Sequence, residues 1–105
     1  MPDNTRTNRI ESNITIDFQS FETLLASASK NRTGSLVDVS ITNTGDAAVY
    51  VASLSDGTTP TSNKDANIIA PGDYLALDKI NLARLFVKTT DAGAANSLNL
   101  TGTAE

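Results

Sequence analysis

The chain has 105 residues, which suits one domain and leaves no room for two. Thr, Ser and Asn supply 34 of these residues, a composition that favours turns and exposed strand faces over helices. The net charge is −4, and the eight Lys and Arg residues are scattered, so the clustered positive charge that nucleic-acid binding requires is missing.

The first 12 residues are almost wholly polar, and Ile10 is their only apolar side chain after the first residue. We predict a flexible, extended N-terminal arm over residues 1–12 and a single domain over residues 13–105. Arg6 and Arg9 lie close together in this arm. A solvated arm is the preferred interpretation of these two charges and a nucleic-acid contact is the alternative, and both arginines are interface candidates. The arm lacks the apolar stretch of a signal peptide, so we expect synthesis and folding in a cytoplasm. No apolar run reaches the roughly 20 residues that span a bilayer, so no membrane partner is expected.

Residues 14–18 alternate between apolar and polar side chains, which predicts a half-buried strand. Residues 21–29 are ambiguous, because their apolar positions fit one face of a helix and also a strand with a bulge. We predict a strand there, on the basis of the family resemblance described below.

The clearest strand signal is the alternation of Val37, Val39 and Ile41 with polar residues. The sequence Asn-Thr-Gly-Asp at 43–46 is a strong turn signal, since Asn and Gly tolerate left-handed backbone conformations. A second apolar alternation follows at 48–52. The sequence therefore predicts a hairpin, with the apolar residues of both strands facing one core.

A long polar stretch at 55–67 predicts a surface loop, and Pro71 followed by Gly72 predicts a type II turn. Further short strands are predicted at residues 68–70, 74–77, 82–89 and 97–101. The total of about seven strands joined by short turns indicates an all-β fold, either an antiparallel β-sandwich or a small jelly-roll-like barrel.

The chain contains no histidine and no cysteine, which excludes Ser-His-Asp and Cys-His arrangements, thiol nucleophiles and thiolate metal sites. Aspartates fall mainly in predicted turns, where their side chains usually bond the backbone. These are Asp46, Asp56, Asp65, Asp73 and Asp91. A weak calcium site at Asp56 and Asp65 is the alternative, but the Asp-x-Asp-x-Asp-Gly spacing is absent. We expect no enzyme activity, no cofactor and no metal.

On the strand predicted at 82–89, Phe86 shares a face with Arg84 and Lys88, opposite Leu85 and Val87 in the core. An apolar residue on an outer face needs a cover, supplied by a second sheet or by another subunit. Arg84, Phe86 and Lys88 are therefore interface candidates, beside the two arginines of the arm.

Sugar-binding sites commonly use stacked aromatic rings, and this chain has no Trp. Tyr50 and Tyr74 are the residues available for such a platform. A place at the edge of the core suits both of them better.

The segment from Leu24 to Thr101 resembles a recurrent module of small tailed-phage virion structural proteins. The residues that carry the resemblance are Arg32, Val-Asp-Val-Ser-Ile-Thr-Asn-Thr-Gly at 37–45, Ala-Val-Tyr-Val at 48–51, a polar loop at 57–62, Ile-Ile-Ala-Pro-Gly at 68–72, Tyr-Leu-Ala-Leu at 74–77, Leu-Phe-Val at 85–87 and Ser-Leu-Asn-Leu at 97–100. In that family the part matching 24–28 is usually extended. Many members carry a Gly where this chain has Asp-Ala-Asn at 65–67, which leaves the geometry of this loop open.

The resemblance implies a capsid decoration or cement protein that binds the outer surface of the phage head and stabilises the shell. It further implies the major capsid protein as partner, a homo-oligomer, with a trimer favoured, and a place on the exterior of the virion. It supplies no catalytic residues. A tail, fibre or adsorption module that binds host-surface glycans is the alternative function.

Overall fold

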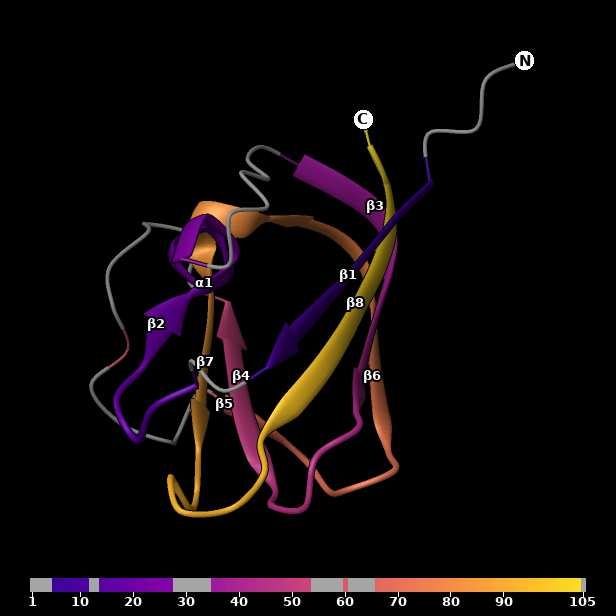
Figure 1. Ribbon diagram of the computed structural model, residues 1–105. Helices are drawn as coiled ribbons and strands as arrows, with labels where there is room; N and C mark the ends of the chain where they lie inside the picture. The colour runs from indigo at the N-terminus through magenta and orange to yellow at the C-terminus, as the bar shows by residue number, and fades with distance from the viewer. Residues whose placement is uncertain (1–4, 12–13, 28–34, 54–59, 61–65, 105) are drawn as a thin grey trace.

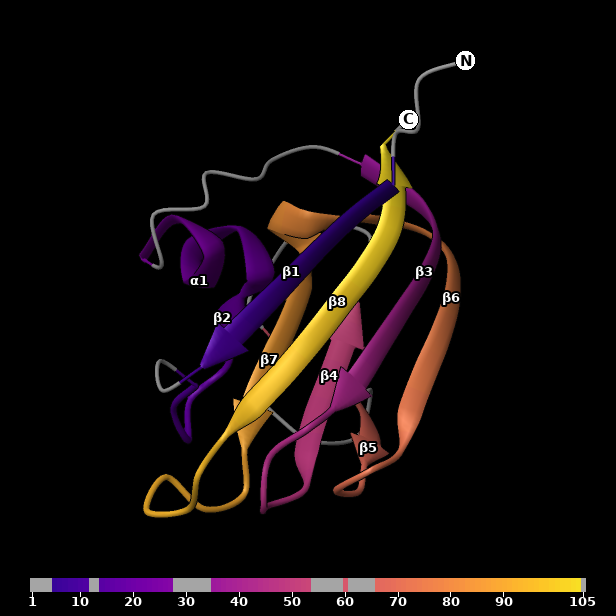
Figure 2. The same ribbon diagram turned by 45° about the vertical axis from the view of Figure 1, so that its right-hand side comes forward.

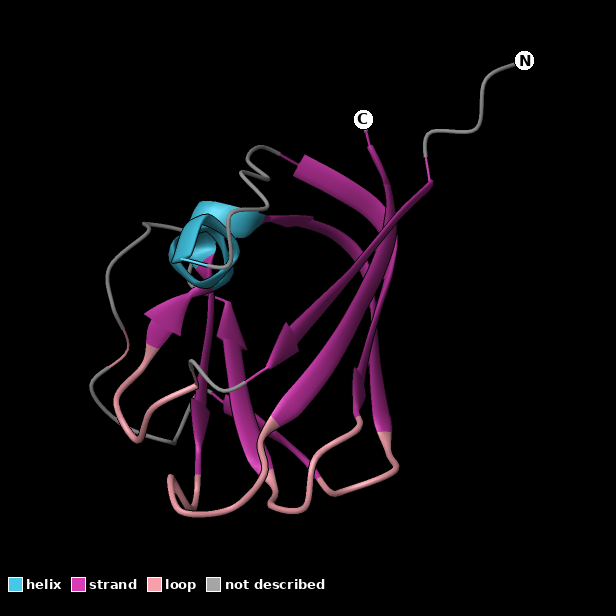
Figure 3. Ribbon diagram, viewed as in Figure 1, coloured by secondary structure: helices cyan, strands magenta, loops and turns pink. Residues whose placement is uncertain are grey.

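The computed structural model describes residues 5–11, 14–27, 35–53, 60 and 66–104, and these form two antiparallel four-stranded sheets packed face to face (Figures 1 and 3). The elements are β1 (Thr5–Glu11), β2 (Gln19–Ser20), α1 (Phe21–Ser27), β3 (Ser35–Asn43), β4 (Val49–Ser53), β5 (Ala66–Ile69), β6 (Tyr74–Asn81), the 3-10 turn η2 (Leu82–Arg84), β7 (Leu85–Thr89) and β8 (Ser97–Ala104). Sheet I has the order β1-β8-β3-β6, and sheet II has the order β2-β7-β4-β5.

This strand order is that of a jelly roll, in which most connections pass from one sheet to the other. Among the strands described, only β4 and β5 are both consecutive in sequence and paired in one sheet. The predicted all-β sandwich is therefore confirmed. The described residues hold eight strands where about seven were predicted, and β2 contains only two residues.

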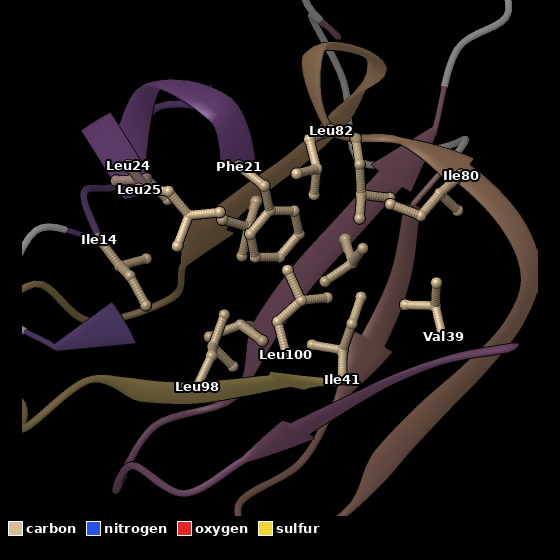
Figure 4. Packing of buried hydrophobic residues seen from close by; sticks show 14 of the residues in the cluster. Ile14, Phe21, Leu24, Leu25, Val39, Ile41, Ile80, Leu82, Leu98 and Leu100 are labelled. Atoms are coloured by element: carbon tan, nitrogen blue, oxygen red, sulfur yellow. The ribbon is translucent and has the colours of Figure 1, made fainter. Parts of the chain in front are cut away.

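The core fills the space between the two sheets, and α1 and η2 cover its upper end (Figures 1 and 4). Its buried residues come from both sheets and from the helix. They are Ile14, Phe21, Leu24, Leu25, Leu36, Val39, Ile41, Val49, Val51, Ile69, Ile80, Leu82, Leu85, Val87, Leu98 and Leu100. Side chains of β4, β7 and β8 point alternately to the two faces of their sheets, which explains why the inward residues of these strands were predicted correctly.

The strand predicted at 21–29 is wrong over Phe21–Ser27, which forms helix α1. Ser20 precedes the helix, and its hydroxyl oxygen accepts a hydrogen bond from the Thr23 backbone N–H at 3.1 Å, an N-cap. The side chains of Phe21, Leu24 and Leu25 are completely buried, as the spacing i, i+3, i+4 on one helical face requires.

The strand predicted at 14–18 is also wrong. Ile14 is buried, but Ile16 and Asp17 form a bend, and the side chain of Ile16 is 59% exposed. The Thr15 hydroxyl oxygen accepts a hydrogen bond from the Asp17 N–H at 3.2 Å, and this local bond competes with strand pairing.

The hairpin predicted around residues 43–46 is wrong as well, because β3 belongs to sheet I and β4 to sheet II. The backbone N–H groups of Thr44 and Asp46 donate to carbonyl oxygens of Ser97 and Ala95, at 3.0 and 2.8 Å. The turn is therefore held by the β7–β8 connection, and the chain crosses between the layers. Val39 and Ile41 of β3 and Val49 and Val51 of β4 do face one core, as predicted.

The flexible arm predicted over residues 1–12 differs from the structure at Thr5–Glu11, which form strand β1. This strand pairs with β8 along its whole length, from Thr5 opposite Thr103 to Glu11 opposite Ser97 (Figure 2). The physical reason is that β8 would otherwise end sheet I with a row of unpaired backbone N–H and C=O groups, and β1 satisfies them.

A bulge in β3 changes which residues face the core. Asp38 has a φ of 52°, and the pairing of β3 with β8 shifts between Val37 and Ser40. As a result Leu36 is buried, whereas Val37, predicted to face the core, is only half-buried.

The remaining sequence predictions have different outcomes. The turn at 71–72 is confirmed, since Gly72 has a φ of 84° and the Asp73 N–H donates to the Ala70 carbonyl at 2.9 Å. The strand predicted at 82–89 begins at Leu85, after η2. Most of the loop predicted at 55–67 lies outside the described residues.

Candidate interaction surface

The outer face of sheet II carries a row of large side chains across its strands. Tyr50 of β4 lies opposite Lys88 of β7 on one side and opposite Ile68 of β5 on the other. Phe18, just before β2, completes the row, because the Lys88 ammonium lies over its ring. We call Phe18, Lys88, Tyr50 and Ile68 the outer row.

Lys88 is enclosed between two aromatic rings. Its Nζ lies 5.1 Å from the centroid of Phe18 and 5.4 Å from the centroid of Tyr50, so it makes a cation–π interaction with each ring. Phe18, Lys88 and Tyr50 are half-buried, whereas Ile68 is 60% exposed. The row therefore presents one positive charge within an apolar surface.

The neighbouring row of the same face is covered within the chain. Phe86 lies opposite Ala52 and Ser20, and the side chains of Phe86 and Ala52 are only 4% and 2% exposed. Phe86 and Lys88 do share the outer face, as predicted. Phe86 is nevertheless not available to a second subunit, so as an interface candidate it is replaced by the outer row beside it.

The other interface candidates lie elsewhere. Arg84 is exposed but belongs to η2, outside the strand on which it was predicted. Arg6 and Arg9 lie on β1, opposite Gly102 and Asn99 in sheet I. The structure therefore does not bring the five predicted residues together on one surface.

The outer face of sheet I has a different character. Its residues next to the buried Leu98 and Leu100 are polar and half-buried: Ser40, Thr42, Asn99, Thr101 and Thr103. Tyr74, at the β6 edge of this sheet, is 66% exposed, not at the edge of the core as predicted. Since Tyr50 and Tyr74 lie on opposite sheets, they cannot form one stacking platform for a sugar.

A buried polar network closes the lower end of the sandwich. The Asn43 side-chain amide donates to the carbonyl oxygens of Ala47 and Ile69, at 2.8 and 2.9 Å, and its oxygen accepts from the Gly45 N–H at 2.9 Å. The Thr89 hydroxyl donates to the Asn96 side-chain oxygen at 2.6 Å. These groups satisfy one another and tie the sheet-crossing turns together, which is a structural role.

The aspartates in the described turns fit the role predicted for them in one clear case. The Asp91 carboxylate accepts a hydrogen bond from the Gly93 N–H at 2.9 Å. Asp56 and Asp65, the alternative calcium ligands, lie outside the described residues. Within the described part of the chain, no three His, Cys, Asp or Glu side chains are grouped so as to hold a metal ion. In the same part, no helix is long and apolar enough to cross a membrane.

Sequence reasoning missed the outer row because it depends on strand pairing. The alternation of β4 and β7 does place Tyr50 and Lys88 outside. Their contact with each other and with Phe18 follows only from the order β2-β7-β4-β5, which no local pattern indicates.

Comparisons of the chain with protein-family models and with curated proteins found no match. Two solved structures of the Tobacco streak virus coat protein are similar in fold. The coat protein dimer has 8% sequence identity and a TM-score of 0.40, and a second crystal form has 8% identity and a TM-score of 0.39. Both alignments cover 98% of this chain and 88% of the coat protein chain. Likenesses this distant carry no argument about function.

Proposed function

We propose that this chain is a structural protein of a tailed-phage virion, a decoration protein that binds the outer surface of the head and stabilises the shell. The observation that carries the proposal is the outer row, a largely apolar surface with one cation that the described chain covers only in part, with Ile68 60% exposed. Two features support it: the sequence resemblance over 24–101, and the jelly-roll architecture, which virus shell proteins and lectins use repeatedly.

The proposed mechanism is attachment at many equivalent positions. A protein that binds only the assembled shell stabilises that shell by mass action, in proportion to its affinity and copy number. We propose the major capsid protein as the partner and a trimer as the attached unit. Light scattering tests the trimer, since three chains of 11.0 kDa have a mass of about 33 kDa.

The test of the function is the copy number of this chain in purified particles of the phage that encodes it, measured by quantitative mass spectrometry. Hundreds of copies per particle support decoration of the head. A handful supports the alternative, a tail or fibre module, and absence from the particle contradicts both.

We further propose that Arg6 and Arg9 of β1 contact the shell, and the test of this contact must keep the strand in place. Deleting residues 2–12 would remove β1 and expose the edge of β8, so loss of binding would not be informative. Replacing Arg6 and Arg9 by Ser removes both charges and keeps the strand backbone. Weaker shell binding at an unchanged melting temperature supports a contact by these arginines, and unchanged binding contradicts it.

A further inference from the structure

We propose that the outer row binds a protein surface of different sequence that places a carboxylate among apolar side chains, and that Lys88 pairs with this carboxylate. The inference rests on the proposed function, because it names the chemistry of the surface that a decoration protein would meet. Three properties of Lys88 lead to it: its restrained position, its lack of an ion pair among the described residues, and its central place in the row.

The position of Lys88 is restrained before any partner binds. A lysine side chain normally loses considerable rotamer freedom when it is immobilised at an interface. Here the rings of Phe18 and Tyr50 already hold the ammonium from two sides. Pairing with a carboxylate therefore costs little additional order, as for any preorganised contact.

Lys88 has no ion pair in the described part of the chain. The contacts described for its ammonium are with the aromatic rings of Phe18 and Tyr50 in its own row, and Phe86 lies in the next row. The positive charge is thus left in surroundings from which water will be partly excluded once an apolar surface covers the row. A partner without a negative charge at this point would leave a desolvated cation unpaired, which is costly.

The central place of Lys88 argues against a second copy of this chain as the molecule that binds the outer row. A two-fold axis through the outer row would bring the two ammonium groups towards each other in a surface that becomes buried. Like charges in such a setting repel strongly. A nucleic acid is equally unsuited, because phosphate binding draws on several clustered cations and the outer row has one. A carboxylate-bearing protein surface satisfies both the charge and the apolar side chains.

The experiment uses carbodiimide, which joins a lysine amine to a carboxylate in direct contact without a spacer. Purified particles containing this chain are treated and digested, and the cross-linked peptides are sequenced. We expect Lys88 joined to an Asp or Glu of another virion protein. Lys79, which is exposed on sheet I, is the internal comparison, and we expect no link from Lys79 to another virion protein. A link from Lys88 to a second copy, or particles in which Lys88 is not linked, would overturn the inference and leave the function standing. If particles lack the chain, the function fails and the inference with it.

Variants measure how much the pair contributes. Binding to shells stripped of this protein should fall about 30-fold or more for Lys88→Glu and about 10-fold for Lys88→Met, which keeps an apolar side chain against the rings. Lys88→Arg should bind within about threefold of wild type, because Arg also stacks on aromatic rings. Lys79→Glu makes the same charge change on the other sheet and should have little effect. Equal binding by wild type and Lys88→Glu, with both folded by circular dichroism, contradicts the inference.

Discussion

Replacing Asn43 by Ala should destabilise the protein far more than its single side chain suggests. Asn43 is 1% exposed, and its amide joins three backbone groups of the sheet-crossing turns. The substitution leaves the buried Ile69 carbonyl oxygen, the part-buried Ala47 carbonyl oxygen and the Gly45 N–H without these partners. At about 1 kcal/mol for each lost hydrogen bond, the free energy of unfolding should fall by about 3 kcal/mol. Domains of this kind have only about 5–15 kcal/mol in total.

The assay is urea unfolding followed by circular dichroism, with thermal melting as a second measurement. A loss of about 3 kcal/mol corresponds to a drop of roughly 12 °C or more in the melting temperature. The measurement is repeated at several protein concentrations, because an oligomer would add a concentration-dependent contribution. Asn81→Ala is the matched control. Asn81 accepts one hydrogen bond, from the exposed Ala83 N–H at 2.9 Å, so its loss should be below about 1 kcal/mol.

The variant Asn43→Asp tests the donor role of the same side chain. It replaces the donor that faces two carbonyl oxygens with a carboxylate oxygen in a buried site. Burial and these carbonyls should raise the pKa of the introduced carboxyl in the folded state. The destabilisation relative to wild type is therefore smallest below the unfolded pKa of about 4, and grows as the pH rises towards neutrality. If Asn43→Ala loses no more stability than Asn81→Ala, or if Asn43→Asp shows no such pH dependence, the role assigned to this amide is wrong.

Other substitutions test single features of the fold by the same unfolding assay. Gly45→Ala should cost about 2 kcal/mol, because its Cβ would lie 2.6 Å from the Ala95 carbonyl oxygen; a neutral result would mean that the turn moves freely. Phe86→Ala should cost about 3–5 kcal/mol and Ile68→Ala less than about 0.5 kcal/mol. Similar losses at the two positions would contradict the burial that separates them. Asp38→Val should cost about 1–2 kcal/mol, since a β-branched residue tolerates a φ of 52° poorly, whereas Asp38→Gly should be neutral; equal stability of the two would argue against the bulge.

The sequence predicted the features that depend on near neighbours. Alternation identified the inward residues of β4, β7 and β8, and Pro71-Gly72 identified its turn. The sequence-based predictions failed where contacts between residues far apart in the chain determine the structure. The Asn-Thr-Gly-Asp turn has the composition of a hairpin, but Asn43 bonds Ile69, 26 positions away, and Thr44 bonds Ser97, 53 positions away. No local sequence pattern indicates such contacts, so the crossing of the chain from sheet I to sheet II could not be predicted.

Helix α1 was a different kind of error, because a local signal was present. Ser20 stands three residues before Thr23, and apolar residues follow at the spacing of one helical face, the usual signs of a capped helix start. The family resemblance, in which this segment is extended, outweighed them. Direct physical signals at a segment should therefore take precedence over the usual conformation of similar proteins.

The contrast between the two outer faces explains why the outer row is the stronger interface candidate. In a β-sandwich the outward positions are normally polar, and sheet I follows this rule with Thr42, Asn99 and Thr101 but departs from it at its β6 edge, where Tyr74 is exposed. Sheet II departs from it at Tyr50 and Ile68, within one cross-strand row. Propensity does not account for the difference, since Thr, Tyr and Ile all suit strands. A protein held on one side by a surface has a reason for such asymmetry. Making Tyr50 and Ile68 polar should then weaken attachment and leave the core intact.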